Sequence, residues 1–86
     1  MVLSVQAIKD AKEKVIGLKQ TLRAIQQDKV NAVVLANDIE EHLVKKILEA
    51  CEEKRISVFP LNIGQRELGR LCQIEVGASV VALIKS

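Results

Sequence analysis

The chain has 86 residues, of which 49% are hydrophobic and 28% are charged, and its formal net charge is +2. This length fits a single domain spanning residues 1–86, and the apolar fraction excludes a disordered chain. Phe59 is the only aromatic residue, which excludes a surface that stacks nucleic-acid bases on several aromatic rings.

The first elements are predicted from capping and spacing. A short helix is expected over residues 4–14, because Ser4 is a good capping residue and apolar side chains follow at a spacing of three to four. A short extended segment at residues 15–16 follows, and Gly17 ends it.

A second helix is predicted over residues 18–27, with two opposite faces. Its apolar face comprises Leu18, Thr21, Leu22 and Ile25. Its polar face comprises Lys19, Arg23, Gln26 and Gln27, with Gln20 beside them. No Asp or Glu occurs between Lys14 and Gln27, so the polar face of this helix is predicted to be free of acids and to carry a net positive charge.

The segment "NAVVLAND" (31–38) is predicted to form a buried strand, parallel to a neighbour because both of its faces are apolar. Asp38 is predicted to cap the next helix, with Glu41 completing a capping box. The helix should end by Lys54 and Arg55, cations suited to a helix C-terminus. Its predicted core face comprises Ile39, Leu43, Ile47, Ala50 and Cys51.

The remainder continues the alternation. "ISVFP" (56–60) is predicted to be a strand, "GQRELGRLC" (64–72) a helix, and "ASVVALI" (78–84) the last strand. Gly69 falls inside the predicted helix, where glycine costs roughly 1 kcal/mol against alanine, so another backbone segment should pass close to it. Helices alternating with strands at this spacing predict an α/β fold: a three-layer α/β/α sandwich with a mixed four-stranded sheet and helices on both faces.

The charges are unevenly distributed. Lys14, Lys19 and Arg23 share an acid-free stretch, whereas six acids lie between Asp38 and Glu53. A polyanion should approach the first region and avoid the second. The first turn of the second helix adds unpaired N–H groups and the positive end of the helix dipole, and Gly17 allows close approach. A solvated helix face is the alternative interpretation of the same pattern.

No catalytic or metal-binding arrangement is evident. His42 is the only histidine and has no second ligand at metal spacing, so it is expected to be a solvated side chain. Cys51 and Cys72 are expected to be buried and reduced, which favours the cytoplasm. The longest apolar run, "VGASVVALI", is shorter than the ~20 residues of a membrane-spanning helix. We therefore expect no enzyme activity, no cofactor, no metal and no membrane association.

Four motifs occur together in one order: "GLKQTLRAI", "VVLANDIE", "ELGRLC" and "IEVGASVVALI". Together they resemble the ribosomal kink-turn-binding family, which includes the archaeal ribosomal protein shared with guide-RNA particles and small bacterial paralogues. The resemblance covers nearly the whole chain. It points to the bacterial branch, whose "GxKQT" and "IEVGA" are both present.

This resemblance implies binding to a kink-turn, an RNA helix bent sharply at a three-nucleotide bulge beside tandem sheared G·A pairs. The start of the second helix would enter the major groove there, Lys19 and Gln20 would contact guanines, and Arg23 would lie near phosphates. The loop before the last strand would cover the bulged nucleotides, and we expect Ile74 and Val76 to be exposed in the free protein. The RNA-binding residues implied are Lys14, Gly17, Leu18, Lys19, Gln20, Arg23, Ile74, Glu75, Val76 and Gly77.

The chain departs from archaeal members at two places. They have Asn-Glu where this chain has Lys19-Gln20, and often proline where it has Gly77. The resulting expectation is a cytoplasmic monomer that binds structured RNA, with the ribosome as one candidate partner and with the acid-rich third helix facing away from the RNA. The alternative function is a protein-interaction module on the same fold.

Overall fold

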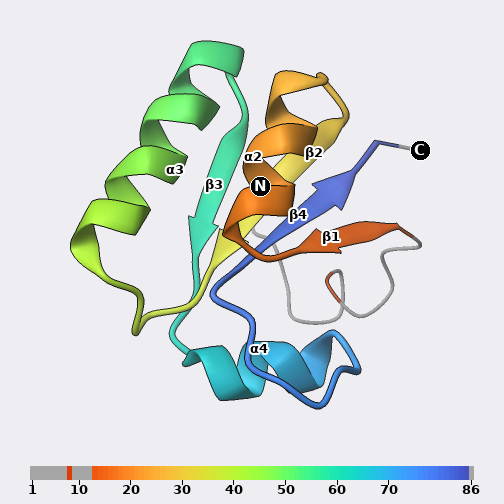
Figure 1. Ribbon diagram of the computed structural model, residues 1–86, viewed down its shortest axis with the longest axis vertical. Coiled ribbons are helices and arrows are strands. Elements are labelled where there is room, and N and C mark those ends of the chain that lie inside the picture. Colours follow the sequence, from red (N-terminus) through yellow and green to blue (C-terminus); the bar gives the residue numbers. More distant parts are fainter. Residues whose placement is uncertain (1–7, 9–12, 86) are drawn as a thin grey trace.

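A computed structural model describes Ile8 and residues 13–85. Its strands form one sheet in the order β1-β4-β2-β3 (Figure 1). The strands are β1 (Lys14–Ile16), β2 (Val30–Leu35), β3 (Ser57–Pro60) and β4 (Val80–Ile84). The helices that follow them are α2 (Leu18–Gln26), α3 (Glu41–Lys54) and α4 (Gln65–Leu71). The helix predicted over residues 4–14 lies mostly outside the described residues, although Ile8 is helical and Lys14 belongs to β1.

The sheet is mixed, as predicted. β2 pairs in parallel with β3, and β4 pairs antiparallel with both β1 and β2. β2 and β4 are the central strands, and their β-branched and small apolar side chains are almost all buried. Central strands covered on both faces read as continuous apolar runs, which is why the sequence predicted them well.

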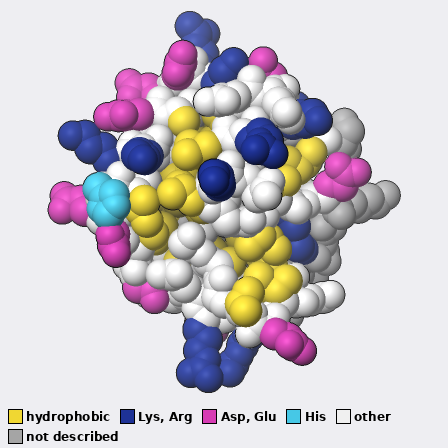
Figure 2. Space-filling model, in the orientation of Figure 1, with side chains coloured by type: hydrophobic (Ala, Val, Ile, Leu, Met, Phe, Trp, Pro, Cys, Tyr) yellow, Lys and Arg dark blue, Asp and Glu magenta, His cyan; other side chains and the backbone are white. Residues whose placement is uncertain are grey.

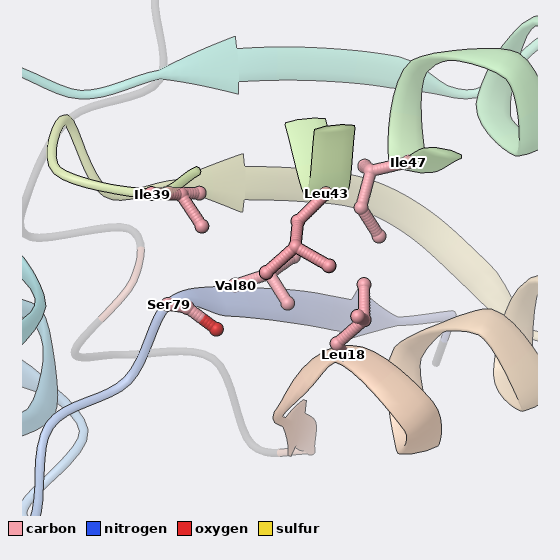
Figure 3. A pocket seen from close by; sticks show the side chains of 6 residues that line it. All are labelled: Leu18, Ile39, Leu43, Ile47, Ser79 and Val80. Carbon is pink, nitrogen blue, oxygen red and sulfur yellow. The ribbon is translucent and has the colours of Figure 1, made fainter. Parts of the chain in front are cut away.

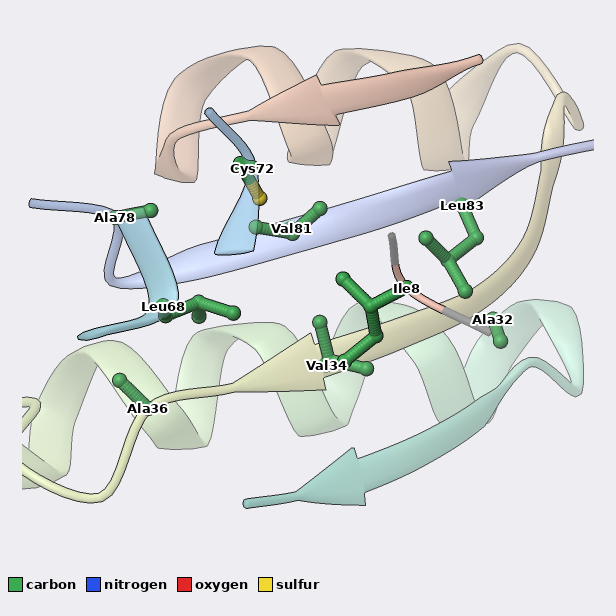
Figure 4. Close-up of a cluster of buried hydrophobic side chains, with 9 residues drawn as sticks. All are labelled: Ile8, Ala32, Val34, Ala36, Leu68, Cys72, Ala78, Val81 and Leu83. Carbon is green, nitrogen blue, oxygen red and sulfur yellow. The ribbon is translucent and has the colours of Figure 1, made fainter. Parts of the chain in front are cut away.

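Side chains of the central strands alternate between two cores. Val34 and Val81 point into one cluster, which includes Leu68 of α4 and Ile8 (Figure 4). Their neighbours along the strands point into the second cluster, beneath α2 and α3. This alternation follows from the two-residue period of a strand. It makes the sheet the middle layer of the predicted three-layer sandwich, with α2 and α3 on one face and α4 on the other.

The alternation is interrupted once, at the start of β2. Val30 and Ala32 are two residues apart, yet Val30 packs in the core under α2 and α3, and Ala32 in the core on the α4 side. The pairing with β4 shifts between these residues, and Asn31 is exposed. A bulge of this kind inserts one residue and restores the correct face for the rest of the strand.

The predicted capping box of α3 is wrong. The residue that precedes α3 is Glu40, whose side chain makes no capping hydrogen bond. Asp38 instead accepts a hydrogen bond at 2.9 Å from the backbone N–H of Gln65, the first residue of α4. Ile39, the residue after Asp38, packs against both cores, and α3 begins only after it, three residues beyond Asp38. Asp38 is left at the start of a different helix.

The acid-rich α3 does not lie on a separate side of the molecule. It packs beside α2 over the same core (Figure 1). An ion pair between Lys54 and Asp28, 3.1 Å apart, joins the end of α3 to the turn after α2. α3 is therefore a direct neighbour of α2, and its orientation away from bound RNA stays a prediction. Figure 2 shows its acidic side chains gathered along the outer margin of this face, with Lys and Arg side chains over α2.

All three described helices begin at the same end of the sheet. The strands β1, β2 and β3 end there and β4 begins there, because Ile16 and Leu35 lie opposite the first residues of β4. Each helix follows one of the strands that end there. The start of α2 is thereby brought beside the loop that precedes β4. Among the described residues, no helix is both long and apolar enough to cross a bilayer.

Candidate functional site

The start of α2 is fixed by Gly17. Its N–H donates to the carbonyl of Val80 at 3.0 Å, and its own carbonyl accepts from the N–H of Thr21 at 3.0 Å. Its φ of +104° and ψ of 155° lie in a region that only glycine adopts readily. A Cβ at Gly17 would have no atom within 4 Å. Conformation therefore explains this glycine, and the space beside it is open to an approaching molecule.

The first turn of α2 has no acidic residue and no side-chain cap. Its backbone N–H groups and the positive end of the helix dipole therefore face solvent. Lys19, Gln20 and Arg23 are all exposed, with Lys19 and Arg23 one turn apart. α3 and α4 each have an acidic residue in the first turn. Among these three helices, the start of α2 is thus the one that best suits an anion.

The apolar face of α2 is directed at the sheet, as predicted. Thr21 and Ile25 are fully buried, and Leu18 and Leu22 are partly buried. The hydroxyl of Thr21 has no hydrogen-bond partner among the described residues. Leu18 is the one implied binding residue on this face. Its role is therefore to pack the helix start, with only part of its side chain reaching the surface.

A small apolar cleft adjoins the start of α2. Figure 3 shows side chains of α2, α3 and β4 converging on it. Its lining residues are Leu18, Ile39, Leu43, Ile47, Ser79 and Val80. The sequence predicted three of these as core positions of the third helix and missed the cleft. The reason is that a core face and the edge of a surface cleft have the same apolar pattern.

The loop before β4 is held against α4. The N–H of Ile74 donates to the carbonyl of Gly69 at 3.1 Å, and the N–H of Ala78 donates to the carbonyl of Gln65 at 2.9 Å. A Cβ at Gly69 would overlap the carbonyl oxygen of Val76. The predicted close approach of another backbone segment to Gly69 is therefore confirmed, and that segment is this loop.

The two apolar residues of the loop differ in exposure. Val76 is 70% exposed, as predicted. The prediction for Ile74 is wrong, because Ile74 is partly buried and packs against the core on the α4 side. The hydrogen bond to Gly69 turns this end of the loop inward. Glu75 and Gly77 are exposed, so the surface of the loop consists of residues 75–77.

Lys14 lies on the other side of the sheet from α2. Its ammonium group donates to the carbonyl of Ile8 at 3.2 Å. Ile16, two residues along β1, packs in the core on the α4 side, whereas Val15 faces the core under α2 and α3. The structure therefore brings Lys19, Gln20 and Arg23 together with the exposed loop at one end of the sheet, and leaves Lys14 apart from them.

The two cysteines are buried in the core, whereas the histidine is exposed to solvent. Cys51 and Cys72 are buried and free, as predicted. Burial raises the pKa of both thiols, while the charge of Lys14 opposes this rise for the pKa of Cys72. His42 is exposed, with its Nδ1 3.3 Å from a carboxylate oxygen of Glu40. Within the described part of the chain, no group of His, Cys, Asp and Glu is arranged to hold a metal ion.

Comparison with known proteins identifies relatives of this chain and a solved structure of similar fold. An RNA-binding protein of Caldanaerobacter subterraneus subsp. tengcongensis is 51% identical over 70 residues, covering 81% of this chain and 84% of the relative. An RNA-binding protein of Halalkalibacterium halodurans is 39% identical over 83 residues, covering 96% of this chain and 100% of the relative. A solved structure, the 15.5 kD RNA-binding protein of Giardia lamblia, superposes with a TM-score of 0.80 at 25% identity, covering 95% of this chain and 68% of that one. The model of the ribosomal protein L7Ae/L30e/S12e/Gadd45 family matches residues 3–86, and the chain belongs to this family.

Proposed function

We propose that this chain is an RNA-binding protein, not an enzyme, that recognises or stabilises kink-turns in structured RNA. The observation that carries the proposal is the start of α2, an acid-free first turn with Lys19, Gln20 and Arg23 exposed around it. Relatives that align over most of the chain are named RNA-binding proteins, which supports RNA over other anions.

The chemistry of the first turn suits the edges of guanine bases. Lys19 donates to guanine O6 and N7, and the amide of Gln20 both donates and accepts. The deep major groove of a regular RNA helix excludes side chains. A sharp bend opens the groove and brings phosphates of two helical segments together. A carboxylate on the inserted surface would be repelled there, and the first turn of α2 has none.

The exposed loop and the cleft supply apolar contacts at the same end of the sheet. Val76 offers an exposed side chain to unstacked bases, and the cleft beside Leu18 offers an apolar wall between α2 and α3. Unpaired bases favour such apolar surfaces because their flat faces are poorly hydrated. Phe59 of β3 is the only Phe, Trp or Tyr in the chain, so aliphatic side chains must supply most of these contacts. RNA with extruded nucleotides therefore suits this end better than a regular duplex.

The decisive measurement compares two RNAs. One is a kink-turn with tandem sheared G·A pairs, and the other has Watson–Crick G·C pairs in their place. We expect the chain to bind the kink-turn at least about tenfold more tightly, a difference of ~1.4 kcal/mol. Equal affinity would reduce the function to general RNA binding.

A protein-interaction module on the same fold is the alternative, and failure to bind either RNA would favour it. Nucleic acid that co-purifies with the chain and is removed by ribonuclease would argue against it. We further propose that the chain acts as a monomer in the cytoplasm, where crosslinking and sequencing of bound RNA in cells would tell ribosomal RNA from other structured transcripts.

A further inference from the structure

An open groove of about 260 Å³ runs along α2 on the side of β1. Gln20, Arg23 and Gln27 form its helical wall, and Glu13 and Lys29 line it from the ends of neighbouring segments. The described residues place α3 on the opposite side of α2 from this groove (Figure 1). The groove is therefore separate from the apolar cleft between the two helices.

The helical wall has a regular polar face. Gln20, Arg23 and Gln27 are spaced by three and four residues, so their side chains leave one side of the helix. The seven residue-to-residue steps from Gln20 to Gln27 span about 10 Å at ~1.5 Å per step. A wall of this length can lie along a short stretch of sugar–phosphate backbone.

The charges of the groove favour an anion. Arg23 and Lys29 are exposed, and neither takes part in an ion pair within the described residues. The carbonyl of Lys29 accepts a hydrogen bond from the N–H of Lys85 at 2.9 Å, which brings another exposed lysine to the same end. Glu13 is the one carboxylate in the lining. Two cations and two donating amides thus face a single acid.

The size and position of the groove favour an extended anionic strand over an enclosed small molecule. Its volume is slightly below the ~300–1,000 Å³ typical of sites that enclose small molecules. Its first residues, Gln20 and Arg23, also belong to the surface at the start of α2. A strand that leaves the start of α2 would therefore meet the groove next, without crossing an acidic region.

We propose that this groove holds the sugar–phosphate backbone of the RNA beyond the kink-turn, with Arg23 and Lys29 each contacting a phosphate. This inference rests on the proposed function and extends it to a second contact surface. Phosphate contacts of this kind position the RNA without reading its sequence. Lys29 should accordingly contribute affinity and salt dependence but no preference for sheared G·A pairs.

The test uses three exposed charges in the full chain: Lys29→Gln, Glu13→Gln, and Lys46→Gln on α3 as the matched control for loss of one cation. Binding of each to the kink-turn and to its G·C counterpart is measured between 50 and 200 mM salt. We expect Lys29→Gln to weaken binding to both RNAs about threefold or more and to lower the salt slope by about 0.7–0.9. Glu13→Gln should tighten binding to both, and Lys46→Gln should leave both within about twofold.

The inference is overturned if Lys29→Gln is no more harmful than Lys46→Gln, or if Glu13→Gln fails to tighten binding. Its failure is distinguishable from failure of the proposed function. If wild-type protein shows no preference for the kink-turn while Lys29 and Glu13 act in opposite directions, the groove stands and kink-turn recognition fails. Absence of binding to both RNAs overturns the two together. Kink-turns with each stem shortened in turn supply a further check, because removal of the stem that occupies the groove should abolish the effect of Lys29→Gln.

Discussion

The start of α2 and the start of α4 lie at the same end of the sheet but are held in opposite ways. Gly17 has no side chain and open space beside it, and the turn after it is uncapped. The first N–H of α4 is capped by Asp38, and the loop that follows α4 rests on Gly69. The start of α2 leaves its first backbone N–H groups without a side-chain cap and open to a ligand, whereas the first N–H of α4 is used in a hydrogen bond within the protein. Substitutions should therefore affect RNA binding in the first and stability in the second.

The largest expected effect is on stability, from Gly69→Ala. Helix propensity alone favours alanine by about 1 kcal/mol. The new Cβ would overlap the carbonyl oxygen of Val76, so the loop must move. We expect a net loss of about 2–3 kcal/mol in the free energy of unfolding, measured with urea. Gly77→Ala is the control, because its Cβ would only reach ordinary contact with Gln65 at 3.4 Å. A Gly69→Ala protein more stable than wild type would refute the close packing.

Lys19→Ala should have the largest effect on binding. Lys19 is exposed on the first turn of α2, so stability should stay within about 0.5 kcal/mol. Loss of a guanine contact should cost on the order of 1–3 kcal/mol of RNA binding and reduce the preference for the kink-turn over its G·C counterpart. Titration of both RNAs measures this. An unchanged ratio of the two affinities would show that Lys19 contributes only charge.

Asp38→Ala tests which helix this residue serves. Removal of the cap on Gln65 should destabilise the protein by about 1 kcal/mol. Glu41→Ala is the matched comparison, and we expect it to cost less than about 0.5 kcal/mol, because Glu41 is exposed and is the first residue of α3, not the third residue that a capping box requires. Equal losses in the free energy of unfolding from the two substitutions would instead support the capping box predicted for α3.

Val76→Asp tests whether the exposed loop after α4 contacts RNA. Val76 is 70% exposed, so the change should alter stability by no more than about 0.5 kcal/mol while a carboxylate near RNA weakens binding. Leu48→Asp on α3 is the control, since Leu48 is also a large hydrophobic residue with an exposed side chain, at 45%. If both substitutions leave RNA affinity unchanged, the loop takes no part in binding.

The smallest effect is expected from Arg23→Ala. Arg23 lies one turn beyond Lys19 and should contact phosphate. Its loss should weaken binding to the two RNAs about equally and lower the salt slope by about one unit or less. A change in the ratio of the two affinities would instead assign base reading to Arg23.

Local patterns predicted the fold because each layer imposes its own period on the sequence. The continuous apolar runs of β2 and β4, the apolar face of α2 and the mid-helix Gly69 each reflect the structural environment of those residues. The partner of Asp38 could not be found this way, since Gln65 lies 27 residues away and a capping residue fits any nearby helix start. For the same reason Lys14 seemed to belong with Lys19, although β1 directs it to the other face of the sheet.

The candidate binding residues could be recognised from the sequence pattern only in part. Lys19, Gln20 and Arg23 stand out because charge is free to accumulate where no core constrains it. Leu18 and Ile74 were named through the family resemblance alone, because residue type does not tell an apolar residue at the surface from one that packs against the core. Residues 13 and 29 come together in the groove through β1 and the turn after α2, a contact that no local period records.

The two hydrogen bonds that tie the loop to α4 have a consequence for the entropy of binding. Ordering the backbone of one residue costs about 1–2 kcal/mol. Ile74 and Ala78 are already fixed by their bonds to Gly69 and Gln65, which leaves only the three residues between them to lose freedom on contact with a ligand. The loop is thus preorganised, and most of its ordering takes place when the protein folds rather than when it binds.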